Sequence, residues 1–201
     1  MHADLSLARK LSAGDAEAFR SLVRAQHHRL ILLATGFTQS RAIAEEVVQD
    51  AWVVVMQNID AYEGRSALSA WIAGIVVNKA RARARKEQRM ISFEAMAGAD
   101  GPAIAPEKFA ADGHWADGMP AWEVVTPERL LGARQLLRKV AETLEGLPPA
   151  QRVAVLLRDV EGLEPAEICR QLDISEGNLR VLLHRARNRL REAADEDLRI
   201  K

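Results

Sequence analysis

The sequence is poor in residues on which many small proteins and enzymes depend. Cys169 is its single cysteine, so the chain can form neither an internal disulfide nor a cysteine-based zinc site, and a reducing cytoplasm suits it best. No stretch approaches the roughly 20 apolar residues that a membrane-spanning helix needs. The N-terminal residues carry no long apolar run behind their positive charges, so we expect no signal peptide.

Features typical of enzymes are missing as well. The sequence holds no glycine-rich phosphate loop, no cluster of metal ligands and no credible pair of nucleophile and base. We therefore expect no enzymatic activity, no cofactor and no metal. Strands that alternate with helices are also absent, which disfavours an α/β fold.

Charge is balanced over the whole chain but not along it. The 28 basic and 28 acidic side chains give a net charge of zero. Residues 91–127, however, hold Lys108 alone against six carboxylates, a net charge of −5. The same segment is rich in glycine and proline and has little periodicity, which is typical of a linker. It also contains Trp115 and Trp122, large apolar side chains that a linker has to place against something.

The first ninety residues have the periodicity of amphipathic helices. One helix is predicted to begin at Asp15, which suits an N-terminal cap, and a second to run from Arg41 to Asn58. The loop 62–66 interrupts the pattern, and a third helix begins at Ser66 and ends in KARARARKEQR. Apolar residues at helical spacing form the predicted core: Phe19, Leu22, Val23, Leu30, Leu33, Ile43, Val47, Ala51, Val54, Val55, Leu68, Ile72, Ile75 and Val76.

Helices resume after Pro127, with one predicted over 128–145, another over 149–159 and two short ones from Pro165 onward. The last two form a helix-turn-helix, in which 173–174 makes a tight turn and Ser175 is a natural N-cap. Glycine is common in such turns, but aspartate enters the left-handed region more readily than most residues. We therefore predict an all-α protein with two small helical domains joined by a flexible acidic linker, the C-terminal domain being a helix-turn-helix.

The second helix of this pair has one apolar and one cationic face. A basic stripe alone is usually a solvated helix face. Joined to a capped helix-turn-helix, whose second helix enters the major groove, it favours DNA binding because clustered arginines suit a dense row of phosphates. The apolar face is Leu179, Leu182, Leu183, Ala186 and Leu190, and the arginines are Arg180, Arg185, Arg187, Arg189 and Arg191.

A second group of cations ends the helix that begins at Ser66, and Trp71 and Asn78 lie upstream on it. An aromatic ring, an amide and several cations together suit single-stranded or melting DNA, where exposed bases stack and offer their edges. The alternatives are core packing for Trp71 and, for the cations, stabilisation of a helix C-terminus.

Three segments resemble a known protein family. AEEVVQDAW (44–52) and YEGRSALSAWIAGIVVNKARARARK (62–86) resemble conserved region two of bacterial sigma-70 factors. LPPAQRVAVLLRDVEGLEPAEICRQLDISEGNLRVLLHRARNRLRE (147–192) resembles their region four. The small size and the short linker, with no room for a region-three domain, indicate the extracytoplasmic-function (ECF) group.

The resemblance implies a role for each part of the chain. Residues 1–92 become a domain for polymerase docking, −10 recognition and melting, 93–127 a linker, and 128–201 a domain for −35 recognition. The implied polymerase-docking residues are Glu46, Gln49 and Asp50. The implied −10 contacts are Arg65, Ser66, Trp71, Asn78, Lys79 and Arg83. The implied −35 contacts are Ser175, Asn178, Arg180, His184, Arg185 and Arg187.

The sequence therefore predicts an alternative sigma factor that takes core RNA polymerase to promoters by reading −10 and −35 elements. The implied partners are the beta-prime clamp helices and the beta flap of core polymerase, promoter DNA, and an anti-sigma factor that holds the protein inactive until a stress signal. The alternative is a stand-alone helix-turn-helix regulator, similar to a response regulator, that binds DNA without docking on polymerase.

Overall fold

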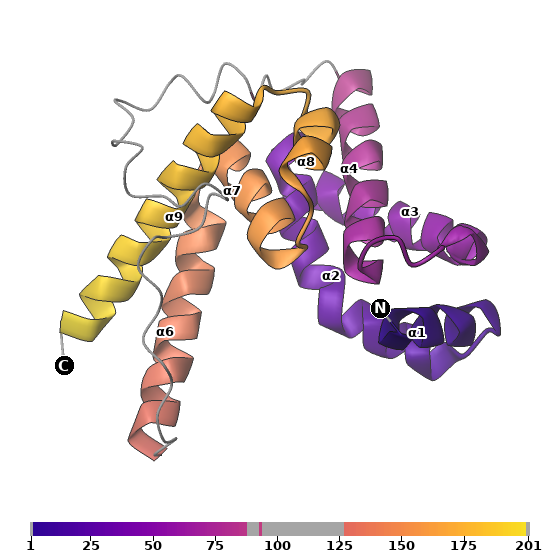
Figure 1. The fold of residues 1–201 in the computed structure, drawn as a ribbon, viewed down its shortest axis with the longest axis horizontal. Helices are drawn as coiled ribbons and strands as arrows, with labels where there is room; N and C mark the ends of the chain where they lie inside the picture. The colour runs from indigo at the N-terminus through magenta and orange to yellow at the C-terminus, as the bar shows by residue number, and fades with distance from the viewer. Residues whose placement is uncertain (1, 88–92, 94–126, 200–201) are drawn as a thin grey trace.

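The chain folds into helices, and the predicted all-α class is confirmed (Figure 1). The computed structural model describes residues 2–87, 93 and 127–199, and it has no strand within these ranges. The N-terminal half (2–87) contains α1 (His2–Ser12), α2 (Ala16–Thr38), α3 (Arg41–Asn58), the 3-10 helix η1 (Ile59–Ala61) and α4 (Leu68–Lys86). The C-terminal half (127–199) contains α6 (Pro127–Gly146), α7 (Pro149–Val155), the π-helical turn η3 (Leu156–Val160), α8 (Pro165–Leu172) and α9 (Glu176–Arg199).

Local signals in the sequence set the helix boundaries of the N-terminal half. Asp15 caps α2, because its Oδ1 accepts hydrogen bonds from the backbone N–H groups of Glu17 and Ala18, both at 3.0 Å. These hydrogen bonds hold the pKa of Asp15 below its usual value. The predicted extent of α3 is confirmed, and α4 begins at Leu68, two residues after the predicted start. Each predicted core residue of these helices is buried or half-buried.

Helix α1 was not predicted from the sequence. Its apolar side chains Ala8 and Leu11 are 7% and 1% exposed, and the helix packs against α2 and η1. Through these contacts α1 lies next to the loop that joins η1 to α4.

The C-terminal half is built on contacts of α9 with α6, α7 and α8. Helix α8 is short, as predicted, but α9 is not: it has 24 residues. The predicted length was wrong because α9 continues beyond the helix-turn-helix and packs along α6, with Ala193 still buried (Figure 1).

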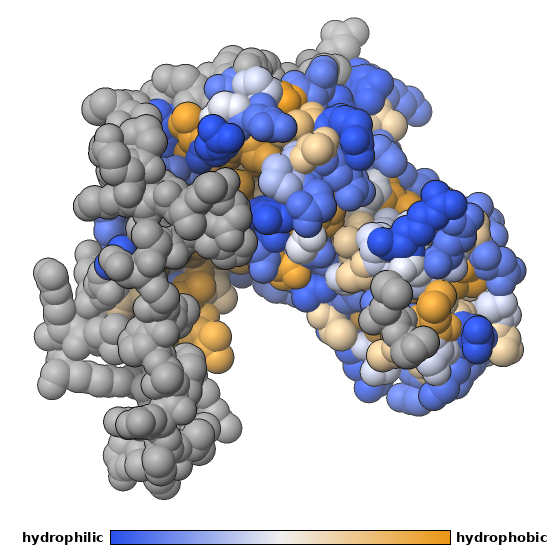
Figure 2. All heavy atoms as spheres, viewed as in Figure 1, coloured by the Kyte–Doolittle hydropathy of each residue, from blue (hydrophilic) through white to orange (hydrophobic). Residues whose placement is uncertain are grey.

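The two halves pack against each other. Helix α2 contacts α7, α4 contacts α8, and the buried residues of both halves belong to one hydrophobic cluster. Phe93, at the start of the predicted linker, is buried with its ring centroid 5.1 Å from that of Phe37. Trp115 and Trp122 lie outside the described residues. In the view of Figure 2, hydrophilic residues cover most of the coloured surface, with hydrophobic residues in small groups among them.

No described helix combines the length and the apolarity that crossing a membrane requires.

The turn between α8 and α9 gives a test of the fold. Asp173 has a φ of 58° and a ψ of 53°, in the left-handed region. A β-branched residue there loses about 1–2 kcal/mol, so we expect Asp173→Val to lower the free energy of unfolding by that amount. Asp173→Gly, which removes Cβ, should be neutral or stabilising. Urea unfolding measures both variants, and equal stability of the two would contradict the left-handed turn.

Candidate polymerase and nucleic-acid interfaces

Helix α3 presents a polar face to solvent. Glu46, Gln49 and Asp50 are all exposed and, at spacings of three and four residues, share that face. Val53, one turn further, is 55% exposed. The opposite face is buried in the core, where Trp52 meets the ring of Phe19 edge to face at 5.8 Å. The predicted docking residues therefore form a continuous exposed surface, to which Val53 adds an apolar side chain that sequence reasoning missed.

This α3 surface is joined electrostatically to α4. Arg83 Nη2 lies 3.3 Å from Glu46 Oε2, and Arg83 Nε donates a 2.6 Å hydrogen bond to Glu87 Oε1. The hydrogen bond to Glu87 raises the pKa of Arg83, and the charges of Glu46 and Asp50 add to this effect. Arg83, a predicted DNA contact, is thus paired with Glu46, a predicted polymerase contact.

The loop before α4 is held by contacts with its own residues and with α1. Tyr62 is buried, and its hydroxyl donates a 2.6 Å hydrogen bond to the carbonyl of Ser66. Burial raises the pKa of Tyr62, and the carboxylate of Asp4 raises it further. Gly64 has a φ of 72°, and a Cβ at this position would lie 3.0 Å from Leu5 Cδ2, so α1 packs directly on the turn.

Asp4 also acts on the first residue of α4. The backbone N–H of Leu68 donates a 3.3 Å hydrogen bond to Asp4 Oδ2, whereas the N-cap residue Ala67 has no side chain that can accept one. Asp4 therefore caps α4 from 64 residues away in the sequence. Sequence reasoning missed this contact because nothing in the local pattern connects two segments so far apart.

The predicted −10 residues lie along one path from this loop onto α4. Arg65 is 85% exposed at its side chain and pairs with Glu63, and Ser66 is exposed. Trp71 is half-buried with its ring centroid 5.7 Å from that of Tyr62, so it is partly packed and partly accessible. Further along the helix, Asn78 is exposed, and Lys79 and Arg83 are half-buried.

The helix-turn-helix has the predicted local geometry. The left-handed turn falls at Asp173, and Ser175 caps α9 by accepting a 3.2 Å hydrogen bond at Oγ from the N–H of Asn178. Ile168 and Leu182 are fully buried where the two helices meet. The amino-terminal end of α9 is therefore capped and packed against α8, and residues 175–177 at this end are exposed.

The cations of α9 have different environments. Arg180, near the start of the helix, is exposed, and Asn178 is half-buried. His184 and Arg185 are half-buried, and burial lowers the pKa of His184, with the charges of Arg185 and Arg187 lowering it further.

Arg187 and Arg189 bond within the C-terminal half. Arg187 donates from Nε and Nη2 to the two oxygens of Asp159, at 2.9 and 2.6 Å, and its side chain is 11% exposed. Arg189 Nη1 donates a 3.0 Å hydrogen bond to Gln151 Oε1. The predicted −35 surface thus combines an accessible amino-terminal end with arginines that also hold α9 to its neighbours.

In the described part of the chain, no group of three or more His, Cys, Asp or Glu side chains is placed to hold a metal ion.

Two family models match the chain in the order of its halves. The model described as "Sigma-70 region 2" covers residues 22–90, and "Sigma-70, region 4" covers 137–190. The ECF RNA polymerase sigma-E factor of Escherichia coli strain K12 is 30% identical over 184 residues, which are 92% of this chain and 90% of that protein. The chain belongs to the ECF sigma factors. The ECF RNA polymerase sigma-E factor of Haemophilus influenzae is 29% identical over an alignment that covers 92% of this chain and 91% of that protein.

Two solved structures are also similar to this sigma factor. CnrH in complex with the cytosolic domain of CnrY is 23% identical with a TM-score of 0.48, covering 97% of this chain and 99% of that one. The Bartonella quintana sigma factor RpoE in complex with the anti-sigma factor NepR is 22% identical with a TM-score of 0.47. The match covers 90% of this chain and 98% of that chain. Helix α1 and Asp4 of this sigma factor precede the region-two match.

The cap on α4 predicts an effect of Asp4. We expect Asp4→Ala to lower the free energy of unfolding by about 0.5–2 kcal/mol, as loss of a helix N-cap does, and to speed hydrogen exchange at the Leu68 amide. Asp4→Asn keeps an acceptor oxygen and should stay near wild type. Unchanged exchange at Leu68 in Asp4→Ala would contradict the cap.

The unequal environments of the α9 arginines predict unequal effects of their removal. Arg187→Ala breaks a bidentate pair at a largely buried side chain, so we expect a loss of about 1–2 kcal/mol in the free energy of unfolding. Arg180→Ala should leave stability within about 0.5 kcal/mol of wild type, as surface substitutions usually do. Thermal unfolding measures the stability of both variants. Equal losses of stability would contradict the prediction that the largely buried Arg187 contributes more to folding than the exposed Arg180.

Proposed function

We propose that this sigma factor binds core RNA polymerase and directs it to promoters through three surfaces. Glu46, Gln49 and Asp50 on α3 dock on the beta-prime clamp helices. The loop before α4, together with α4, reads and melts the −10 element, and the amino-terminal end of α9 reads the −35 element. The observation that carries this proposal is that region-two and region-four matches occur in one chain, each with predicted residues at an exposed surface: Glu46, Gln49 and Asp50 in the first, and Ser175 and Arg180 in the second.

The docking role of α3 is supported by its charge and exposure. Two carboxylates and an amide on one exposed helix face attract a cationic partner and orient it. Such charge complementarity raises the association rate and the specificity of binding more than it raises the affinity. Val53 in the same face gives the partner an apolar side chain to cover.

The −10 role is supported by the mixture of groups on the path from the loop to α4. Trp71 offers part of a ring for stacking, Asn78 an exposed amide for base edges, and Lys79 and Arg83 charge for phosphates. Of the alternatives weighed for Trp71, core packing accounts for part of the ring, which contacts Tyr62 and the hydrophobic cluster, while the residue as a whole stays half-buried.

The −35 role is supported by the capped start of α9. The second helix of a helix-turn-helix reads bases with its amino-terminal residues, and there Ser175 and Arg180 are exposed and Asn178 is half-buried. His184 and Arg185, half-buried further along, suit phosphates beside the groove, whereas Arg187 would have to exchange Asp159 for a phosphate.

Membership of the family supports the remaining parts of the proposal. The protein acts as a binding factor and not as an enzyme, it acts in the cytoplasm where promoter DNA and polymerase are, and an anti-sigma factor holds it inactive until a stress signal. It also binds the beta flap through the region-four half.

Run-off transcription tests the proposal as a whole. The purified protein with core polymerase on a library of random promoters should select templates that share −10 and −35 motifs, and neither component alone should do so. A protein that binds specific DNA equally well without core polymerase would instead be the stand-alone regulator.

Charge reversal on α3 tests the docking surface. We expect Glu46→Lys with Asp50→Lys to weaken binding of core polymerase about tenfold or more, because like charges replace complementary ones, with unchanged helicity by circular dichroism. Since Glu46 also pairs with Arg83, the companion variant Gln49→Lys with Asp50→Lys leaves that pair intact and should show the same loss. Undiminished capture of core enzyme by both variants would refute the docking assignment.

A further inference from the structure

Helix α1 touches the chain on both sides of the loop that precedes α4 (62–67). Its last residue, Ser12, donates a hydrogen bond from Oγ to Asp60 Oδ1 in η1, just before the loop. Near the other end of α1, Asp4 accepts the hydrogen bond of the Leu68 N–H, just after the loop. Two side chains of one helix therefore hold the two ends of the loop.

The middle of the loop also rests on α1. Gly64 is buried, and a Cβ on this glycine would lie 3.0 Å from Leu5 Cδ2 and 3.1 Å from Leu5 Cγ. The Leu5 side chain therefore fills the space directly behind the turn. The hydroxyl of Tyr62 closes the loop across its base by donating to the carbonyl of Ser66. Contacts with α1 thus continue along the loop from one end to the other.

The support comes from the side of the loop that does not meet solvent. Tyr62, Gly64 and Leu68 are buried, whereas Arg65 and Ser66, the proposed DNA contacts of the loop, are exposed. Asp4 and Leu5 contact the loop and the start of α4 at buried residues. Helix α1 therefore lies behind the loop and leaves the proposed DNA contacts accessible.

The start of α4 has no cap of its own. The N-cap position holds Ala67, and the first turn of the helix contains no acidic residue. The first N–H groups of a helix need acceptors, and the positive end of the helix dipole favours a carboxylate. Asp4 supplies both. The position of the first turn of α4, which includes Trp71, therefore depends on α1 and not on the loop sequence alone.

A loop that captures a base discriminates best when its shape is fixed before binding, because the cost of ordering it does not then offset the contacts with the base. We propose that Asp4 and Leu5 are positioning residues for −10 recognition: they touch no DNA, but they fix the loop 62–67 and the first turn of α4 and thereby set how strictly the correct base is distinguished. This inference rests on the proposed function, which places the −10 surface at this loop. Both residues precede the region-two match, which begins at residue 22.

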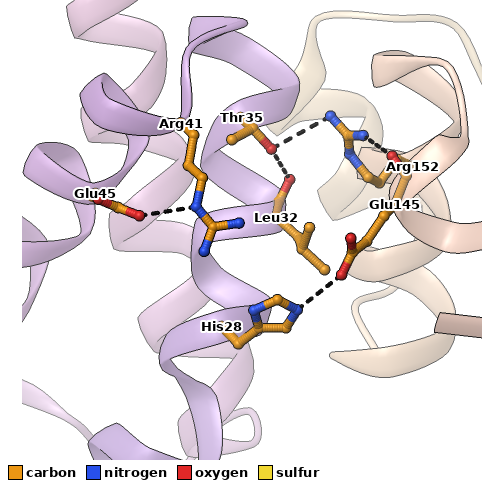
Figure 3. Close-up of polar contacts among 7 residues, drawn as sticks. All are labelled: His28, Leu32, Thr35, Arg41, Glu45, Glu145 and Arg152. Carbon is orange, nitrogen blue, oxygen red and sulfur yellow. Dashed lines mark hydrogen bonds and ion pairs between the residues drawn. The ribbon is translucent and has the colours of Figure 1, made fainter. Parts of the chain in front are cut away.

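Recognition of the −35 element provides an internal control. Helix α1 packs against α2, η1 and α4, all in the N-terminal half. The two halves meet along α2 and α7, through polar pairs such as His28 with Glu145 and Thr35 with Arg152 (Figure 3). A change at Asp4 that acts through the loop should therefore alter −10 recognition and leave −35 recognition unchanged.

Run-off transcription with core polymerase measures the two elements separately. A random promoter library first gives the motifs that the wild-type protein selects. Single-base changes in each motif then give a discrimination ratio for the −10 and for the −35 element. A mismatched base pair usually lowers affinity by a factor of about 5 to 150, and we expect Asp4→Ala to lower the −10 ratio by about threefold to tenfold within that range. The −35 ratio should keep its wild-type value.

Two companion variants separate the cap from the packing. Leu5→Ala empties the space behind Gly64 without touching the cap, so it should lower the −10 ratio as well. Asp4→Asn keeps an acceptor oxygen and should restore a ratio close to wild type. Circular dichroism checks that each variant is folded, and if Asp4→Ala does not fold, the ratio of Leu5→Ala decides. An unchanged −10 ratio in Leu5→Ala would overturn the proposal.

Asp15→Ala is the matched control for stability. It also replaces an aspartate that caps a helix by alanine and removes the same charge, but it acts on α2, at the N–H groups of Glu17 and Ala18. We expect it to leave both discrimination ratios unchanged. A purely structural role of Asp4 would lower transcription from all templates alike. An unchanged −10 ratio in folded Asp4→Ala, or an equal fall of that ratio in Asp15→Ala, would therefore refute the role of α1.

Failure of this inference and failure of the proposed function give different results. A wild-type protein that selects no motif with core polymerase contradicts the proposed function. If the wild type selects both motifs, and the Asp4 and Leu5 variants select them equally strictly, only the inference about α1 fails.

Discussion

Helix α2 is the element on which the rest of the structure depends, because it is buried on more than one side. It packs against α3 and α4 within the N-terminal half and against α7 of the C-terminal half. Where a helix is covered on several sides it is apolar or small over most of its circumference, and α2 meets this condition at its C-terminal end (30–38), where Leu30, Ala34, Gly36 and Phe37 are buried. The same helix thus supports the surface proposed for polymerase docking and holds the second half in place.

The features that could be predicted from the sequence depend on interactions between residues only a few positions apart. Asp15 and Ser175 cap helices through hydrogen bonds to N–H groups two or three positions on. The left-handed conformation of Asp173 follows from the need to turn between two helices and from the tolerance of aspartate for that region. The exposure of Glu46, Gln49 and Asp50 follows from helical periodicity, although their role in docking stays a prediction.

What could not be predicted depends on partners that are distant in the sequence. Periodicity indicates that one face of a helix is buried, but it does not say what buries it. The hydrogen bond from Leu68 to Asp4 spans 64 residues, and the pair of Arg187 with Asp159 spans 28. The contact of Gly36 with Val153 could not be predicted either, because a glycine inside a helix does not indicate which side chain packs against it.

Exposure distinguishes two kinds of arginine that the sequence presents alike. Arg83 pairs with Glu46 at side-chain exposures of 39% and 63%, and an exposed pair of this kind contributes about 0–1 kcal/mol. Glu46 can therefore exchange Arg83 for another cation at little cost, and Arg83 can exchange Glu46 for a phosphate while it keeps its hydrogen bond to Glu87. Arg187, at 11% exposure and bonded to both oxygens of Asp159, exchanges its partner only at a higher cost. A cationic stripe is thus not uniform in function: the accessible arginines are suited to bind a new anion, and the buried ones maintain the helix that presents them.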